Sequence, residues 1–159
     1  MTLTEIFNND GEDFSSKHVK QFFKAAEEAS HFSDWPKQKL GAVIVYKNRI
    51  LSVGWNTTKE TSMQKKFNRF RNFDPERYPN NTHAEMNAIY RLKNEYNLKK
   101  IDMRKVAVFV YRETKDGNIG LAKPCAACEA AMRSIGITQV FYTTEDSIIC
   151  EKFSKKKKS

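Results

Sequence analysis

The sequence is poor in the residues that several common protein classes require. Of its 159 residues, three are cysteine, four are proline and six are glycine. Three cysteines are too few for a disulfide framework, and no internal repeat or proline- and glycine-rich linker divides the chain. No apolar run is long enough to span a membrane, and residues 1–13 are polar and acidic, unlike a signal peptide. We expect one domain in a reducing, cytoplasmic compartment.

Positive charge is what the composition has in excess. The formal net charge is +9, and the four lysines at residues 155–158 supply four of these charges, which leaves +5 for the rest of the chain. A basic protein attracts small nucleotides and polynucleotides alike, so charge does not separate these two classes of partner. We interpret residues 154–159 as a lysine-rich, solubilising tail without a functional role.

The rest of the chain alternates predicted helices and strands. Ser15 and Ser16 are suited to cap a helix with an apolar stripe. Residues 40–46 and 50–55 predict a hairpin with a tight turn. Further strands are predicted at residues 105–112 and 139–143, and at most a short edge segment at 147–150. We therefore predict an α/β fold, a three-layer α/β/α sandwich on a mixed sheet of four to five strands, in one domain of residues 17–153 after an N-terminal segment of residues 1–16.

Two short motifs carry the candidate chemistry. His83 and Glu85 form an H-x-E motif, and Pro124, Cys125 and Cys128 form a P-C-x-x-C motif. Zinc prefers nitrogen and sulfur ligands in tetrahedral geometry, and a catalytic zinc keeps one of its four positions for water, which then ionises near a pH of about 7. One imidazole and two thiolates supply the other three positions. The sequence thus predicts one zinc ion per chain, bound by His83, Cys125 and Cys128.

Glu85 has no place among three zinc ligands and is the candidate proton carrier. Glu85, Ile89, Leu92 and Tyr96 recur at helical spacing after Thr82, which aims the carboxylate inwards. The second motif also opens a predicted helix, which has Pro124 in its first turn and ends at Gly136. Two helix N-termini would then converge on the metal, where they favour thiolate over thiol.

Each motif alone has a simpler interpretation. Thr82 and Glu85 match a capping box, in which the glutamate only hydrogen-bonds back to the start of a helix. Cys125 and Cys128 match a redox pair or half of a structural zinc site. The joint pattern favours catalysis, because the ligand set is complete for an open zinc site and each motif lies at a predicted helix start.

These residues resemble the cytidine and deoxycytidylate deaminase superfamily, whose zinc enzymes carry the same H-x-E and P-C-x-x-C signature. The strand at residues 41–45 and the segment Gly54, Trp55 and Asn56 add to the likeness, which covers about residues 17–145. The resemblance implies a cytidine deaminase-like fold and hydrolytic deamination of a nucleobase. It also implies that Glu85 moves protons, and that Asn56 and the Ala84 backbone amide bind substrate, although Asn56 also fits an ordinary turn.

Residues 57–82 mix cations with aromatic residues, a combination suited to grip phosphate and stack on bases. Most of them also fit an ordinary solvated segment with its aromatics in the core. The segment contains no cysteine or histidine that would bind a second metal before His83. The cations taken as candidate phosphate ligands are Lys65, Lys66, Arg69 and Arg71, and the remaining members of the mixture are Lys59, Phe67, Phe70, Phe73, Arg77 and Tyr78.

Three hypotheses follow for the function. The first is zinc-dependent deamination of a cytosine nucleotide, dCMP to dUMP and ammonia, by an enzyme that we expect to be a homo-oligomer. The second is the same zinc-dependent deamination of a base within a polynucleotide, either adenosine in tRNA or cytosine in single-stranded DNA. The third is a non-catalytic zinc-binding module, with Cys150 or His31 as a fourth ligand.

Residues 145–159 are also short for the helix and strand with which the resembled family continues, and these elements often contribute to oligomer contacts.

Overall fold

The computed structural model describes residues 15–71 and 81–153. The predicted roles of Phe73, Arg77, Tyr78 and the lysine-rich tail lie outside these residues. The chain forms a five-stranded mixed sheet in the order β2-β1-β3-β4-β5. The elements are α2 (Ser16–Ser30), β1 (Gln38–Tyr46), β2 (Arg49–Trp55), α3 (Ser62–Phe67), α4 (Ala84–Glu95), β3 (Ala107–Thr114), α5 (Ala126–Ser134), β4 (Gln139–Thr143) and β5 (Ile148–Lys152).

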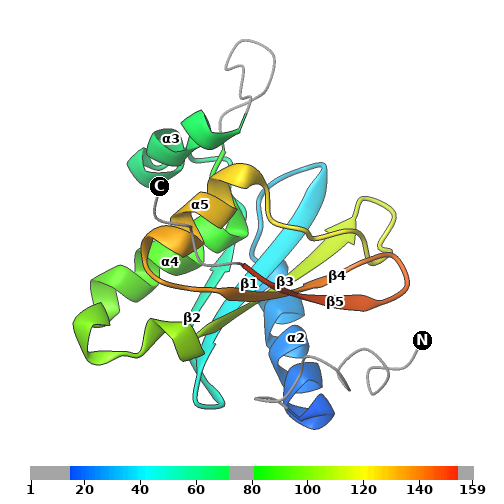
Figure 1. Cartoon of the computed structure of the whole chain (residues 1–159). Helices are drawn as coiled ribbons and strands as arrows, with labels where there is room; N and C mark the ends of the chain where they lie inside the picture. The colour runs from blue at the N-terminus through cyan, green and yellow to red at the C-terminus, as the bar shows by residue number, and fades with distance from the viewer. Residues whose placement is uncertain (1–14, 72–80, 154–159) are drawn as a thin grey trace.

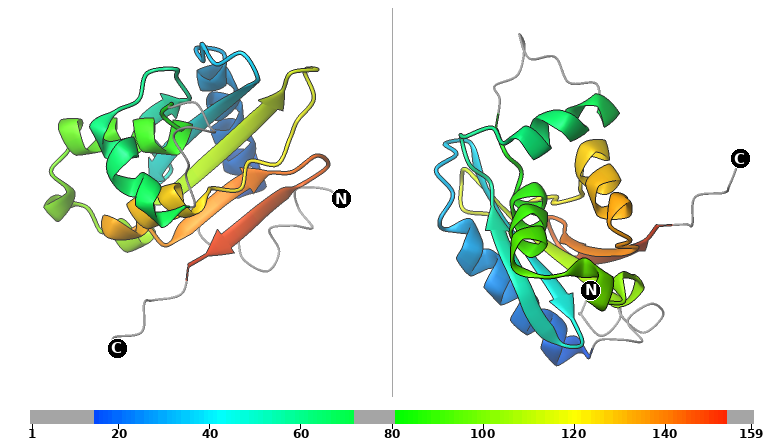
Figure 2. Two further views of the ribbon diagram at one scale, coloured as in Figure 1. Left: turned by 90° about the horizontal axis from the view of Figure 1, so that it is seen from above. Right: turned by 90° about the vertical axis from the view of Figure 1, so that its left-hand side faces the viewer.

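Helices cover both faces of the sheet, as predicted. Figure 1 and the right-hand view of Figure 2 show α2 on one face and α3, α4 and α5 on the other. β3 runs parallel to β4, and the remaining neighbouring strands are antiparallel. The three-layer α/β/α prediction is confirmed, and the short segment predicted at the end of the chain is a fifth strand, β5, at the edge of the sheet.

The helix α2 forms where the sequence predicts it. The Ser15 hydroxyl accepts a hydrogen bond from the His18 backbone N–H and so caps the first turn. The apolar stripe is buried against the sheet, where Phe22 and Phe23 pack on Phe109 with ring centroids 5.1 and 5.4 Å apart. The stripe consists of Val19, Phe22, Phe23, Ala26 and Ala29.

The hairpin of β1 and β2 is closed by a two-residue turn. Lys47 and Asn48 both have positive φ angles, 51° and 60°, the left-handed pair that matches the twist of a hairpin. The predicted three-residue turn is therefore one residue too long, because Arg49 already begins β2. The start predicted for β3 at residue 105 is also too early, since Asp102 caps a 3-10 helix at Met103–Lys105 and the strand begins at Ala107.

Close packing of α4 on β2 positions the start of α4. A Cβ atom at Gly54 would lie 2.5 Å from the Ala84 carbonyl oxygen and would overlap the Ala88 backbone. Only glycine therefore permits this approach, and the Ser52 hydroxyl secures it by donating a 2.7 Å hydrogen bond to the Ala88 carbonyl. In the described part of the chain, no helix combines the length and the apolar character that crossing a bilayer requires.

Replacing Gly54 by alanine should destabilise the protein by about 3 kcal/mol, the upper range for an overpacked core, because backbone atoms of α4 cannot rotate away. The control is Gly117→Ala, which has open space around it but a φ of +83°, and which should cost only about 1 kcal/mol. Urea denaturation of both variants measures the difference. Equal losses would contradict the proposed close packing.

Candidate metal centre and cleft

The three predicted zinc ligands lie at the N-termini of two helices. His83 is the N-cap residue of α4 and Cys125 is the N-cap residue of α5, and neither side chain makes a capping hydrogen bond. Their carbonyl groups instead accept the first helical bonds, from Asn87 and Glu129. The side chains at this position are thus available for a metal, and Cys128 adds a third from the first turn of α5.

The ligand atoms are already gathered. Nδ1 of His83 lies 3.5 Å from Sγ of Cys125 and 3.4 Å from Sγ of Cys128. All three atoms lie within 4.8 Å of one another, and they are the one group of metal-binding side chains found in residues 15–71 and 81–153. An imidazole and two sulfurs at this spacing fit one zinc ion and leave a fourth position without a protein ligand.

The electrostatics of the two sulfurs also suit a cation. The Cys128 thiol hydrogen-bonds to the Cys125 sulfur and, with help from His83, lowers the pKa of Cys125 to about 3 against the opposing effect of burial. The same hydrogen bond, together with complete burial, raises the pKa of Cys128 well above its usual value. Cys125 is thus the sulfur favoured as a thiolate, and any proton on Cys128 must leave when both sulfurs bind a metal as thiolates.

Glu85 is buried beside this cluster, with only 3% of its surface exposed. Burial raises the pKa of its carboxyl group. Its Oε1 is buried and has no hydrogen-bond partner among the described residues. A buried, unpartnered carboxyl oxygen is costly to the fold and is therefore a mark of a functional site. Glu85 is also absent from the metal cluster, so its carboxyl group is available for proton transfer.

The capping-box interpretation of Glu85 is wrong. The helix begins one residue later than that motif requires, with His83 as the N-cap. The Thr82 hydroxyl donates a 2.6 Å hydrogen bond to the Lys59 carbonyl, and the Thr82 N–H donates to Thr57. The helical stripe that starts at Glu85 also ends sooner than predicted, because Tyr96 lies beyond the last turn and is 39% exposed.

α5 begins two residues later than predicted, at Ala126. Cys125 has extended backbone angles, so Pro124 precedes the N-cap and does not lie in the first turn. Gly136 ends the helix with a φ of +92°, as predicted. Cys150 and His31, considered above as a fourth ligand, are not members of the metal cluster.

A cleft of about 150 Å³ opens in front of the cluster. It lies at the end of the sheet where β2, β3 and β4 finish and where α4 and α5 begin. Among the predicted substrate ligands, Asn56 and Ala84 both line it. The Asn56 side chain is buried and hydrogen-bonded to β1, accepting from the Leu40 N–H and donating to the Gln38 carbonyl. The described lining residues are Gln38, Leu40, Asn56, Asn81, His83, Ala84, Glu85, Arg112, Leu121, Ala122, Lys123 and Cys125.

A network of buried and partly buried polar side chains contacts His83 at its backbone N–H and at Nε2, the ring nitrogen that does not face the two sulfurs. The Gln64 Oε1 accepts a 2.9 Å hydrogen bond from the His83 backbone N–H, and the Gln64 Nε2 donates to Asn68. Arg71 donates to the same Asn68 oxygen and places Nη1 3.1 Å from Nε2 of His83. Such contacts fix the orientation of a metal-binding histidine. Gln64 was not predicted, because a glutamine within a short helix carries no local pattern that marks it as buried.

The four cations predicted to bind phosphate are not among the described residues that line the cleft. Lys65, Lys66 and Arg69 are exposed on and after α3, whereas Arg71 contacts His83. The structure instead brings two other cations to the cleft, Arg112 and Lys123. A phosphate role for the first four stays a prediction.

The fold and the cluster of His83, Cys125 and Cys128 are those of a zinc-binding deaminase. The chain belongs to the family described as the cytidine and deoxycytidylate deaminase zinc-binding region, whose profile matches residues 15–144. An uncharacterized deaminase from the luxG 3′ region of Aliivibrio fischeri is 30% identical over 127 residues, which are 79% of this chain and 72% of that protein.

Two solved structures share the fold. A dCMP deaminase from the cyanophage S-TIM5 superposes with a TM-score of 0.57 at 22% identity and covers 84% of this chain and 88% of its own. A cytidine deaminase from Burkholderia pseudomallei gives a TM-score of 0.56 at 20% identity, with 84% and 91% coverage. At these identities the likeness extends to the fold alone.

The purified protein should contain about one zinc ion per chain, because three ligand atoms are preassembled. Cys128→Ser should abolish zinc binding, whereas Cys150→Ser should retain it. Elemental analysis measures the metal content. Chelation should also lower the melting temperature of the wild type but not that of Cys128→Ser, since ligands that bind only the folded state stabilise it. Zinc retained by Cys128→Ser would contradict the assigned ligand set.

Proposed function

We propose that the protein catalyses hydrolytic deamination of a cytosine nucleotide, with dCMP as the preferred substrate and dUMP and ammonia as products. The observation that carries this proposal is the buried Glu85 carboxyl group, which lines a base-sized cleft beside the metal ligands and whose Oε1 has no hydrogen-bond partner among the described residues. A redox pair or a structural zinc site has no use for such an acid.

The cleft has room for a single ring. Its volume of about 150 Å³ matches that of a cavity of roughly 150 Å³ that binds a benzene ring. A single pyrimidine ring suits this space, so the base would enter and the sugar would remain near the mouth. Asn56 and Ala84 both line the cleft. In this proposal the Asn56 amide exchanges a bond to β1 for one to the base or sugar, and the Ala84 backbone amide binds the substrate as well.

His83, Cys125 and Cys128 would hold the zinc ion, which when bound acts as a Lewis acid and makes water a nucleophile near neutral pH. Glu85 would accept a proton from this water and deliver it to N3 of the cytosine ring. After the water oxygen has bonded to C4, Glu85 would take the remaining proton from that oxygen and pass it to the amine. The C4–N bond then breaks and ammonia leaves. A carboxyl group whose pKa is raised by burial suits both the accepting and the donating step.

The relatives support this choice of substrate. The phage dCMP deaminase that shares the fold has also been solved in complex with dCMP and dUMP. We extend to this chain the expectation of a cytosine nucleotide substrate and of a homo-oligomeric, cytoplasmic enzyme.

Glu85→Gln should reduce turnover by a factor of about 10² to 10⁴, the usual contribution of a general acid–base group, and leave the zinc content at its wild-type level. The matched control is Glu129→Gln, which also removes a carboxylate from the first turn of a helix, α5, but outside the cleft. Ammonia release and elemental analysis on the same samples measure both quantities. Full activity in Glu85→Gln would rule out the assigned role.

A substrate panel tests the reaction itself. Ammonia release should be detected with dCMP, and dCTP, CMP and cytidine define the preference for sugar and phosphate. A single-stranded DNA or tRNA substrate, assayed by sequencing, examines the polynucleotide alternative. Absence of ammonia from every free nucleotide, with zinc present at one per chain, would overturn the proposal.

A further inference from the structure

We propose that Arg112 and Lys123 form an anion subsite at the mouth of the cleft, and that this subsite binds the phosphate group of the substrate. The inference rests on the proposed function and adds the residues that distinguish a nucleotide from a nucleoside. Neither residue belongs to the two zinc motifs.

The sheet places Arg112 next to the residues expected to hold the base. Arg112 on β3 pairs with Leu40 on β1. Leu40 in turn accepts a 3.3 Å hydrogen bond from the Asn56 N–H at the end of β2. Asn56, Leu40 and Arg112 therefore form a row across the end of the sheet, and all three line the cleft.

The loop between β3 and α5 is fixed to this row and brings in Lys123. The Arg112 Nη1 donates a 3.1 Å hydrogen bond to the Leu121 carbonyl, and the Gly120 N–H donates to the Arg112 carbonyl. On the other side, the Ala122 N–H donates a 2.8 Å bond to Thr143 at the end of β4. A loop held on both sides presents Lys123 in a defined place, directly before the helix that carries the zinc ligands.

Arg112 has hydrogen-bonding capacity that its protein contacts leave unused. Its Nε is buried and has no hydrogen-bond partner among the described residues. A guanidinium N–H without an acceptor is unfavourable in a buried position, and Arg is suited to bind phosphate through two parallel hydrogen bonds. A phosphate oxygen at the cleft mouth would supply the acceptor that Nε lacks.

The balance of charge at the cleft also favours an anion. Its described lining includes two cations, Arg112 and Lys123, and one carboxyl group, that of Glu85. Lys123 pairs with Glu151 on β5 at 3.8 Å, and the two side chains are 57% and 37% exposed. Exposed ion pairs of this kind contribute little, so a phosphate can compete with Glu151 for Lys123.

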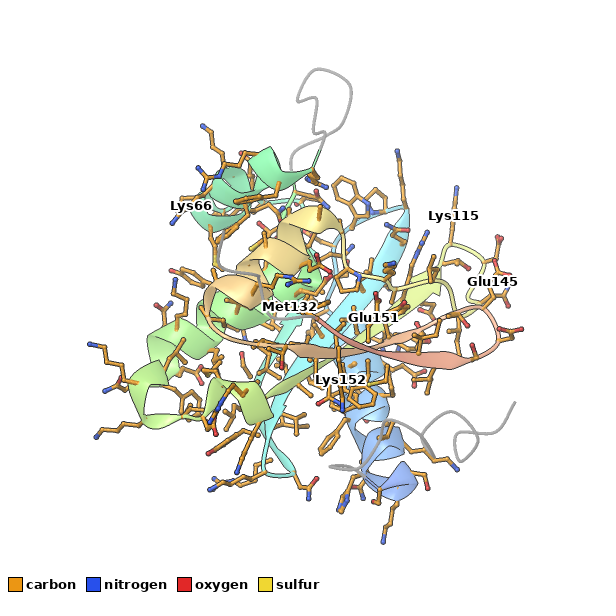
Figure 3. The ribbon with its side chains drawn as sticks, in the orientation of Figure 1. Lys66, Lys115, Met132, Glu145, Glu151 and Lys152 are labelled. Atoms are coloured by element: carbon orange, nitrogen blue, oxygen red, sulfur yellow. The ribbon has the colours of Figure 1, made fainter. Side chains whose placement is uncertain are left out.

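The predicted phosphate ligands on α3 face a different hollow. Lys66 and Arg69 line a separate depression of about 780 Å³, together with residues of α5 and Phe153. Figure 3 shows Lys66 on α3 and Lys115 on the loop after β3, on opposite sides of the view. Since the base occupies the cleft, a phosphate joined to the same sugar lies nearer to Arg112 and Lys123 than to this depression.

The test compares dCMP with deoxycytidine, which differ only in the phosphate. In Lys123→Gln and Arg112→Gln, kcat/KM for dCMP should fall about ten-fold or more, the loss expected for one charge-assisted hydrogen bond. The same parameter for deoxycytidine should change less than about two-fold. Arg112 also donates a hydrogen bond to Leu121, so thermal melting must show that Arg112→Gln is folded. If Arg112→Gln does not fold, Lys123→Gln alone decides the test, because the Lys123 side chain is exposed.

Two controls separate an anion subsite from a structural or general charge effect. Glu151→Gln removes the ion pair but keeps the Lys123 cation, so it should leave dCMP turnover unchanged or improved. Lys115→Gln removes one charge from the same loop outside the cleft lining and should have no effect. Equal losses for dCMP and deoxycytidine, or a loss in either control as large as in Lys123→Gln, would overturn the inference.

A binding measurement separates failure of the anion subsite from failure of the proposed reaction, because it does not require turnover. Calorimetry of the zinc-loaded protein with inorganic phosphate and with dCMP should show binding that Lys123→Gln weakens, even if no substrate is turned over. The same measurement with a single-stranded oligonucleotide that contains an internal deoxycytidine examines the source of the phosphate. If the bound phosphate belongs to a polynucleotide, the oligonucleotide should bind more tightly than dCMP. Absence of phosphate and dCMP binding in the wild type would refute the subsite.

Discussion

The site depends on two helices that begin at the same end of the sheet. Each helix N-terminus carries a partial positive charge, which stabilises negative charge in front of it. At most such positions a serine, threonine or aspartate side chain caps the helix. Here His83 and Cys125 occupy the cap position without capping, and their side chains turn to one another. The two helices therefore lack the stabilisation that a capping side chain provides. A cation bound by the same side chains would offset this loss.

The sheet determines how accurately those helix starts are placed. Gly54 lets the backbone of α4 approach β2 without an intervening side chain, which fixes the first turn that carries Glu85. Gln64 and Arg71 then hold the backbone and the ring of His83 from the opposite side. The ligands are consequently set by main-chain packing and buried hydrogen bonds rather than by flexible side chains, which is the arrangement that a catalytic metal requires.

The sequence was informative where the chemistry is local. The zinc ligands and Glu85 lie in two short motifs, and the hairpin, α2 and the three layers follow from periodicity and turn residues. Arg112 and Lys123 could not be found in this way. Arg112 reaches the cleft only because β3 pairs with β1 in a register that brings it beside Leu40, and Lys123 depends on hydrogen bonds between its loop and β4. Gln64 was missed for the same reason, since its burial comes from tertiary contacts.

The acid and the two cations that line the cleft come from different elements of the fold. The one acid that lines the described part of the cleft, Glu85, is buried at the start of α4, whereas the cations Arg112 and Lys123 belong to the strand and loop that border the cleft. Positive charge in a cleft attracts anions and orients them before contact. A nucleotide drawn by its phosphate would thus be held at the rim with its base free to enter. Under these proposals, phosphate binding by Arg112 and Lys123 and proton transfer by Glu85 would use different parts of one small cleft.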